Sequence, residues 1–213
     1  MKGNLIIISS PSGGGKGTLI REVLATVPNI GYSVSLTTRK PRLGEIDGRD
    51  YHFVNKEYFE HYIQKGSFLE YAEVHGNWYG TSLNQVEKLT SAGTDVILEI
   101  DVQGADSVLE RVPTAVSVFI LPPSFAVLQA RLTARNTEGP ADLAVRLSNS
   151  AGEVSQYTKF KYVVINDEVP AASRKLASVI MAERQRRDRQ DDTIQAILDS
   201  FEQSKVKTTG ELD

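Results

Sequence analysis

Residues 5–18, LIIISSPSGGGKGT, decide the fold of this chain. The stretch opens with four apolar residues that do not alternate with polar ones, a pattern typical of a strand buried on both faces of a parallel sheet. A glycine-rich turn follows, and residues 16–26 have the composition of a helix. A strand, a glycine-rich loop and a helix in this order predict a phosphate-binding loop.

The predicted loop comprises nine residues: Ser10, Pro11, Ser12, Gly13, Gly14, Gly15, Lys16, Gly17 and Thr18. Glycines allow successive backbone amides to turn toward an anion, and the amino end of the following helix adds partial positive charge. The strict pattern has glycine at position 10 and a hydroxyl residue at position 17, so Ser10 and Gly17 depart from it. Thr18 carries the nearest hydroxyl, and we expect it to be the candidate ligand of Mg²⁺.

Composition narrows the classes of function. The chain has 213 residues, 40% of them hydrophobic, and its formal net charge is 24 minus 27, or -3. These values fit one globular domain and argue against a nucleic-acid partner. The absence of cysteine excludes disulfides and thiol chemistry, and the three histidines are scattered. The first apolar run is too short for a signal sequence or a membrane span, so we expect no membrane partner and a cytoplasmic location.

The remaining chain alternates predicted strands with predicted helices. The strands lie at 95–101, 115–121 and 162–166, and helices are expected at 104–111, 171–189 and 191–203. This alternation predicts an α/β fold with a parallel sheet covered by helices. We expect four parts: a core of residues 1–32, 89–124 and 158–190, an insertion at 33–88 with strands, turns and one helix near 56–65, a charged helical segment at 125–157, and a C-terminal helix and tail at 191–213.

The insertion is rich in side chains that bind phosphate. Residues 33–51 combine hydroxyls, arginines that include Arg39 and Arg42, and Tyr51 around turn residues. An arginine pairs bidentately with a phosphate, and a tyrosine hydroxyl donates to a further oxygen. A solvated basic turn is the alternative interpretation. A GTPase is a weak alternative, because residues 101–104 have the Asp-x-x-Gly spacing but the chain lacks an Asn-Lys-x-Asp run.

Six further sequence runs carry recognisable motifs: SVSLTTRKPR at 33–42, FLEYA at 68–72, NWYGT at 77–81, IDVQG at 100–104, LPPS at 121–124 and VIND at 164–167. With the loop, they span nearly the whole chain, from residue 4 to about residue 187. Together they resemble the guanylate kinase family. The resemblance implies transfer of the terminal phosphate of ATP to GMP, with Mg²⁺ accompanying ATP. It also implies a P-loop NTPase fold with a three-layer α/β core, an inserted GMP-binding subdomain (33–88) and a helical lid (125–157).

The resemblance also implies roles for individual residues. Arg39, Arg42, Tyr51 and Tyr79 would hold the GMP phosphate; Ser35, Glu70, Thr81 and Asp101 would face guanine; and Glu45 and Glu99 would complete the GMP site. ATP would bind the loop residues together with Asn166 and Asp167, and the catalytic cations would be Lys16, Arg39, Arg131, Arg135 and Arg146. Glu99 stands where the family commonly has aspartate, so it reaches one methylene further toward the magnesium waters or Lys16.

Glu70 has a chemical rationale as the reader of guanine. Guanine presents two adjacent donors, which one carboxylate accepts, whereas adenine presents an acceptor at the matching ring position. The alternatives are another nucleoside monophosphate kinase, or a related module without catalysis that binds phosphopeptides. The retained Lys16 and lid arginines favour the enzyme. The sequence leaves the oligomeric state open, with a homo-oligomer as one candidate.

Overall fold

The computed structural model describes residues 2–42, 44–74, 76–135 and 140–209. The side chains of residues 135, 140–143, 146 and 204–209 lie outside the described part. Arg135 and Arg146 are among these, so two of the expected lid cations cannot be placed. Within the described residues, no helix is long and apolar enough to cross a membrane.

A parallel sheet of five strands forms the centre of the molecule, in the order β2-β7-β1-β8-β9. The strands are β1 (Leu5–Ser9), β2 (Ile30–Tyr32), β7 (Asp95–Glu99), β8 (Val116–Leu121) and β9 (Tyr162–Ile165). The predicted α/β class and the buried first strand are confirmed, since Ile6, Ile7 and Ile8 are fully buried. The strand β2 was not predicted.

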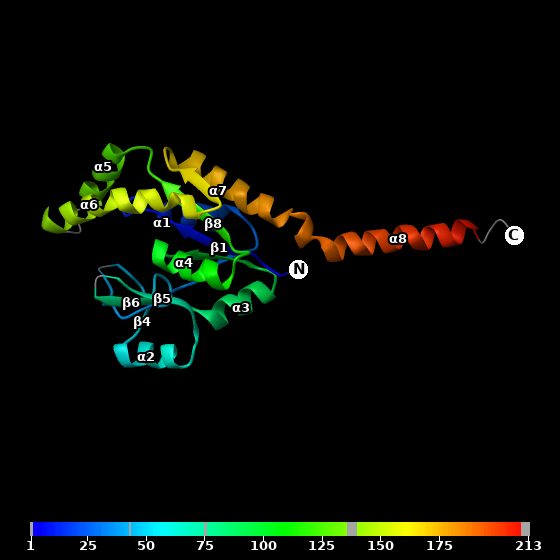
Figure 1. Cartoon of the computed structure of the whole chain (residues 1–213), viewed down its shortest axis with the longest axis horizontal. Coiled ribbons are helices and arrows are strands. Elements are labelled where there is room, and N and C mark those ends of the chain that lie inside the picture. Colours follow the sequence, from blue (N-terminus) through cyan, green and yellow to red (C-terminus); the bar gives the residue numbers. More distant parts are fainter. Residues whose placement is uncertain (1, 43, 75, 136–139, 210–213) are drawn as a thin grey trace.

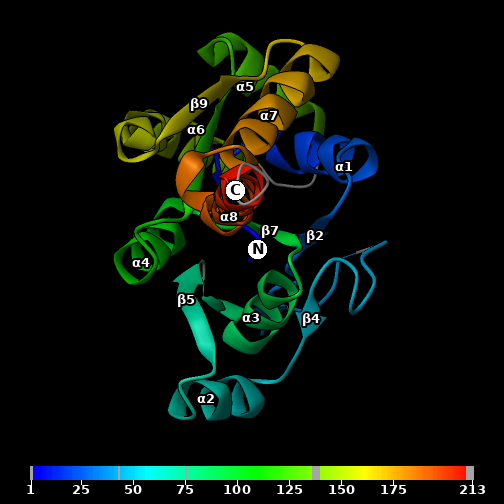
Figure 2. The ribbon, with the colours of Figure 1, turned by 90° about the vertical axis from the view of Figure 1, so that its right-hand side faces the viewer.

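Helices cover both faces of this sheet, which gives three layers (Figure 2). One face packs against α1 (Lys16–Thr26) and α7 (Val169–Arg184), and the other against α3 (Leu83–Ser91) and α4 (Val102–Arg111). The sequence interpretation missed α3, and it extended α7 to residue 189. The helix ends at Arg184, whose guanidinium pairs with Asp95 at 2.7 Å.

A second, smaller sheet lies below the core in Figure 1. Its order is β4-β3-β6-β5, and its strands are β3 (Leu36–Thr37), β4 (His52–Phe53), β5 (Phe68–Val74) and β6 (Asn77–Ser82). The helix α2 (Lys56–Gln64) begins after Asn55, whose side chain accepts a hydrogen bond from the Tyr58 amide, as expected of an N-cap. Phe59 of α2 stacks on Phe68 with ring centroids 4.5 Å apart.

Three more helices lie in the part of the chain that the structure describes. The helices α5 (Phe125–Arg135) and α6 (Pro140–Ser155) lie beside the core, and α8 (Asp191–Thr209) projects away from it (Figure 1). Short 3-10 turns span Gln156–Lys159 and Arg187–Arg189. The loop before α1 lies at the carboxyl end of β1, and the smaller sheet lies near the carboxyl end of β7. Open α/β sheets bind ligands at the carboxyl ends of their strands.

Candidate active site

The predicted phosphate-binding loop joins the carboxyl end of β1 to the amino end of α1, so the expected order of strand, loop and helix is confirmed. Gly13 and Gly15 have φ angles of 83° and 87°, in the left-handed region that favours glycine. A Cβ on Gly15 would lie 2.2 Å from Asn166 Nδ2, so no larger side chain fits there. Lys16 Nζ donates to the Ile100 carbonyl at 3.0 Å, which places its charge beside the end of β7.

Residues distant in sequence form hydrogen bonds with the backbone of the loop. Asn166 Nδ2 donates to the Gly14 carbonyl at 2.9 Å, and Arg131 Nη2 donates to the Asn166 carbonyl at 2.9 Å. Arg131 Nη1 also approaches the Gly14 carbonyl at 3.4 Å. Asn166, a predicted ATP-site residue, and Arg131, a predicted catalytic cation, thus both contact the loop. The side chain of Asp167, the other predicted ATP-site residue outside the loop, is exposed and lies 3.6 Å from Lys175.

A carboxylate that the sequence interpretation did not select also reaches the loop. Glu153 of α6 accepts a hydrogen bond from the Ser12 amide at 2.8 Å. A carboxylate on a loop amide occupies the kind of donor that a phosphate oxygen would use. The segment 125–157, which we predicted to be a lid, therefore contacts the glycine-rich loop through an acid as well as through Arg131.

A cavity of about 220 Å³ separates the loop from the smaller sheet. Seven predicted site residues line it: Lys16, Ser35, Tyr51, Glu70, Tyr79, Glu99 and Asp101. They come from α1, from the segments just before β3 and β4, from β5 and β6, and from the stretch between the end of β7 and the start of α4. The fold thus brings the phosphate loop and the insertion to one cavity.

Glu70 forms the most buried acidic group of this cavity, with only 6% of the residue exposed. Its Oε1 accepts a hydrogen bond from the Thr81 hydroxyl at 2.6 Å. The pKa of Glu70 is raised to about 7, chiefly by burial and to a smaller extent by the charge of Asp101, while the hydrogen bond from Thr81 opposes the rise. A Cβ on Gly104 would lie 2.9 Å from Glu70 Oε2, so the glycine leaves room for the carboxylate.

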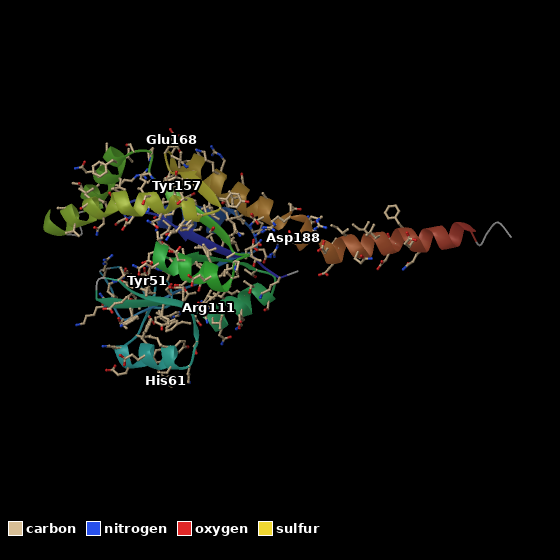
Figure 3. All side chains as sticks on the ribbon, in the orientation of Figure 1. Tyr51, His61, Arg111, Tyr157, Glu168 and Asp188 are labelled. Carbon is tan, nitrogen blue, oxygen red and sulfur yellow. The ribbon has the colours of Figure 1, made fainter. Side chains whose placement is uncertain are left out.

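Two side chains at α4 order the surroundings of Glu70: Asp101 caps the helix, and Arg111 binds the strand that carries Glu70. Asp101 Oδ1 caps α4 by accepting from the Gly104 amide at 2.8 Å. Arg111, labelled in Figure 3 where α4 meets β5, donates to the Phe68 carbonyl at 2.9 Å and to the Leu69 carbonyl. These contacts hold the strand immediately before Glu70. Gly104 and Arg111 were missed as site residues because no local pattern signals a contact with β5.

Arg39 is the centre of a second polar cluster. Its Nε donates to the Tyr79 hydroxyl at 3.2 Å, and its guanidinium lies 5.4 Å from the centroid of the Tyr51 ring. Glu45 accepts both terminal nitrogens at 2.9 and 3.0 Å, which raises the pKa of Arg39 and lowers that of Glu45. Glu45 therefore occupies the guanidinium fork that a phosphate would use.

The remaining predicted residues lie around this cluster. Burial and the charge of Glu99 raise the pKa of Tyr51, labelled in Figure 3, to about 12, so its hydroxyl stays a donor. The Arg42 amide donates to Glu45 at 2.7 Å, and its side chain is exposed. The structure thus gathers Arg39, Tyr51 and Tyr79 on one side of the cavity.

Few side chains near the loop could bind a metal ion. No group of three or more His, Asp or Glu side chains that could hold a metal is found among the described residues. Near the loop, the Thr18 hydroxyl accepts from Arg21 at 3.3 Å, and the Glu99 carboxylate accepts from the Tyr32 hydroxyl at 3.2 Å. Oxygen donors of this kind suit a hard cation carried by a nucleotide rather than a fixed protein cage.

Comparisons with a family model, with curated proteins and with solved structures all point to one family. The family model for guanylate kinase matches residues 2–183. A guanylate kinase of Aliivibrio fischeri is 47% identical over 202 residues, covering 94% of this chain and 98% of that protein. One of Neisseria meningitidis serogroup A is 49% identical over 199 residues, covering 93% and 97%. The crystal structure of guanylate kinase from Anaplasma phagocytophilum has a TM-score of 0.75 at 33% identity, and the match covers 88% of this chain and 89% of that one.

Proposed function

The chain belongs to the guanylate kinase family, and we infer that it transfers the terminal phosphate of ATP to GMP, giving ADP and GDP. The observation that carries this inference is the shared cavity, because Lys16 of the phosphate loop and the buried Glu70 line the same space. A phosphate donor on the loop and an acceptor on the smaller sheet would then face each other.

The GMP site would use two parts of the cavity. Glu70 and Thr81 form a buried hydrogen-bonded pair, so an ionised Glu70 can accept the two adjacent donors of guanine. Ser35 and Asp101 line the same cavity. Sites built on polar pairing of this kind reject a partner lacking the donors by roughly 10⁴. dGMP would serve as a further acceptor.

The GMP phosphate would bind the cluster around Arg39. The guanidinium supplies a planar fork, and Tyr51 and Tyr79 supply hydroxyl donors beside it. Because Glu45 accepts hydrogen bonds from both terminal nitrogens of Arg39, a phosphate would have to take over at least one of them. Arg42 would add charge from the exposed side.

ATP would bind along the phosphate loop, residues 10–18, beside Asn166 and Asp167. Phosphoryl transfer depends mainly on positioning and on cations around the transferred group. Lys16 and Arg131 provide such cations from the loop and from α5, together with Arg39. We expect Arg135 and Arg146, whose side chains lie outside the described part, to add to them.

Kinases that use ATP generally need a divalent metal, and we propose Mg²⁺. When bound, it would neutralise phosphate charge. Thr18 and Glu99 are the oxygen-bearing side chains that could face it, directly or through water. The cation would arrive with ATP.

Further proposals concern the cellular location and the partners of the enzyme. ATP and GMP as substrates support a cytoplasmic location, and the net charge of -3 argues against a nucleic-acid partner.

A homo-oligomer would cover the apolar residues of α8, since Ile194, Ile197 and Leu198 are 37%, 51% and 53% exposed. Sedimentation of the protein and of a Leu198→Asp variant tests this: a monomeric wild type would contradict it.

Titration calorimetry with GMP tests the proposed site. We expect wild type to bind GMP and Glu70→Gln to bind it between about 10- and 100-fold more weakly, because a charge-assisted hydrogen-bond pair is lost. Glu73→Gln, on the exposed side of the same strand, is the matched control and should bind normally. Equal affinity of Glu70→Gln and wild type would refute the assignment of Glu70.

A further inference from the structure

The strand β5 is irregular immediately before Glu70. Phe68 pairs with Ser82 of β6, but Glu70 pairs with Thr81, so Leu69 is an extra residue on this strand. One extra residue on one strand of an antiparallel pair is a β-bulge. In a regular strand, side chains alternate between the two faces, and Phe68 and Glu70 would project from the same face.

The bulge places these two side chains on different faces of the smaller sheet. The Phe68 ring stacks on Phe59 of α2, and the Tyr71 ring lies 5.8 Å from it on the same side. Glu70 and Ala72 instead line the cavity that faces the phosphate loop. A shift of one residue moves a strand's side chains to the other face. Without the extra residue, a Phe68 held by Phe59 would therefore direct Glu70 toward α2 and away from the cavity.

Arg111 binds both carbonyls of the bulge. Its Nη1 donates to the Phe68 carbonyl at 2.9 Å and to the adjacent Leu69 carbonyl. Consecutive carbonyls of a regular strand point to opposite sides, so one nitrogen reaches both of them only where the strand is distorted. The contact is therefore specific to the bulged conformation.

The helix that carries Arg111 belongs to the core and also faces the Glu70 carboxylate. Arg111 is the last residue of α4, and Gly104 lies in its first turn. A Cβ on Gly104 would lie 2.9 Å from Glu70 Oε2. One end of α4 thus leaves room for the carboxylate, while the other end binds the backbone two residues before it.

We propose that Arg111 is a positioning residue for the recognition of guanine: by binding both carbonyls of the bulge, it keeps the Glu70 carboxylate directed into the cavity. Arg111 is not one of the described residues that line the cavity, so it acts through Glu70 and not on the nucleotide. This inference rests on the proposed function, because it presumes that guanine binds Glu70.

The experiment compares GMP with inosine monophosphate, which keeps the ring imino donor of guanine and lacks the exocyclic amine. The KM for GMP, the KM for ATP, kcat, and the inhibition constant of inosine monophosphate against GMP are measured for wild type and Arg111→Met. We expect Arg111→Met to raise the KM for GMP about tenfold and to leave kcat and the KM for ATP within about threefold. The inhibition constant should rise by less than about threefold, because inosine monophosphate makes only one of the two hydrogen bonds that depend on the position of Glu70.

A double variant separates this role from general damage. If Arg111 acts through Glu70, adding Arg111→Met to Glu70→Gln should raise the KM for GMP by less than about threefold beyond Glu70→Gln alone. Arg174→Met, which removes an exposed arginine of α7, is the matched control and should behave like wild type. Arg111→Lys keeps a cation but not the planar fork, and it should show the same pattern with a factor of about three.

Thermal unfolding checks that each variant is folded, and Arg111→Lys decides the same comparisons if Arg111→Met is not. An unchanged KM for GMP, equal losses for GMP and inosine monophosphate, or full additivity in the double variant would overturn the proposal. A wild type that converts GMP to GDP leaves the proposed function standing in that case, whereas a wild type that does not bind GMP overturns both.

Discussion

Glu70 should make the use of GMP depend on pH in the neutral range. Its pKa is raised to about 7 by burial, and only its ionised form can accept both donors of guanine. With a pKa near 7, about one tenth of the free enzyme carries ionised Glu70 at pH 6 and about nine tenths at pH 8. The KM for GMP should therefore be about tenfold higher at pH 6 than at pH 8, with little change in the KM for ATP.

The assay is steady-state ADP formation with GMP varied at saturating ATP, repeated at half-unit steps between pH 5.5 and 8.5. The phosphate of GMP also titrates, with a pKa of about 6, and contributes its own dependence. Glu70→Gln separates the two, because its amide does not ionise and leaves only the dependence of the phosphate. Identical pH profiles of KM for wild type and Glu70→Gln would refute the reasoning.

The same pKa predicts an effect on stability. Because folding raises the pKa of Glu70 above its usual 4.5, the protonated form favours the folded state. The contribution is complete below pH 4.5 and is lost as the pH rises through about 7, which amounts to about 3 kcal/mol. Thermal unfolding should therefore show Glu70→Gln gaining stability over wild type between pH 4 and pH 8. A constant difference in Tm across this range would contradict the burial of an ionisable Glu70.

Two substitutions test other parts of the site, and a third tests the packing of the smaller sheet. Lys16→Met should keep the fold, checked by circular dichroism, and lower kcat by about 10²- to 10³-fold, because a cation at the transferred phosphate is lost; turnover like wild type would remove Lys16 from the mechanism. Gly104→Ala should raise the KM for GMP about tenfold, since its Cβ would lie 2.9 Å from Glu70 Oε2, and an equal rise for ATP would argue for general damage instead. Gly80→Ala should lower the free energy of unfolding by about 1–3 kcal/mol, because its Cβ would lie 2.7 Å from the Phe68 ring; an unchanged urea midpoint would show that the ring can move aside.

The sequence predicts the core well where the signal is local. The run at 5–9 is apolar without alternation and the loop after it is rich in glycine, so strand, loop and helix follow from neighbouring residues alone. The strand β2 carries no such signal. It spans three residues with a glycine at the centre, and it is defined by pairing with β7, more than 60 residues away. Contacts of this separation cannot be seen in a local pattern.

The candidate site could likewise be predicted only in part from the sequence. The motif runs point to residues that meet at one cavity, such as Glu70 and Lys16. The raised pKa of Glu70, the room left by Gly104 and the contact of Glu153 with Ser12 arise from packing between distant segments. The sequence shows which chemical groups are present, and the fold decides their protonation and their partners.

The most direct test of the proposed activity is the choice of acceptor. ADP release from ATP and Mg²⁺ is measured with GMP, dGMP, AMP, UMP or CMP in turn, alongside a reaction without acceptor. The account predicts rapid turnover with GMP, and with dGMP, and background rates with the other three, because only guanine offers both donors to Glu70. Turnover with AMP equal to that with GMP, or binding of GMP without any phosphate transfer, would contradict it.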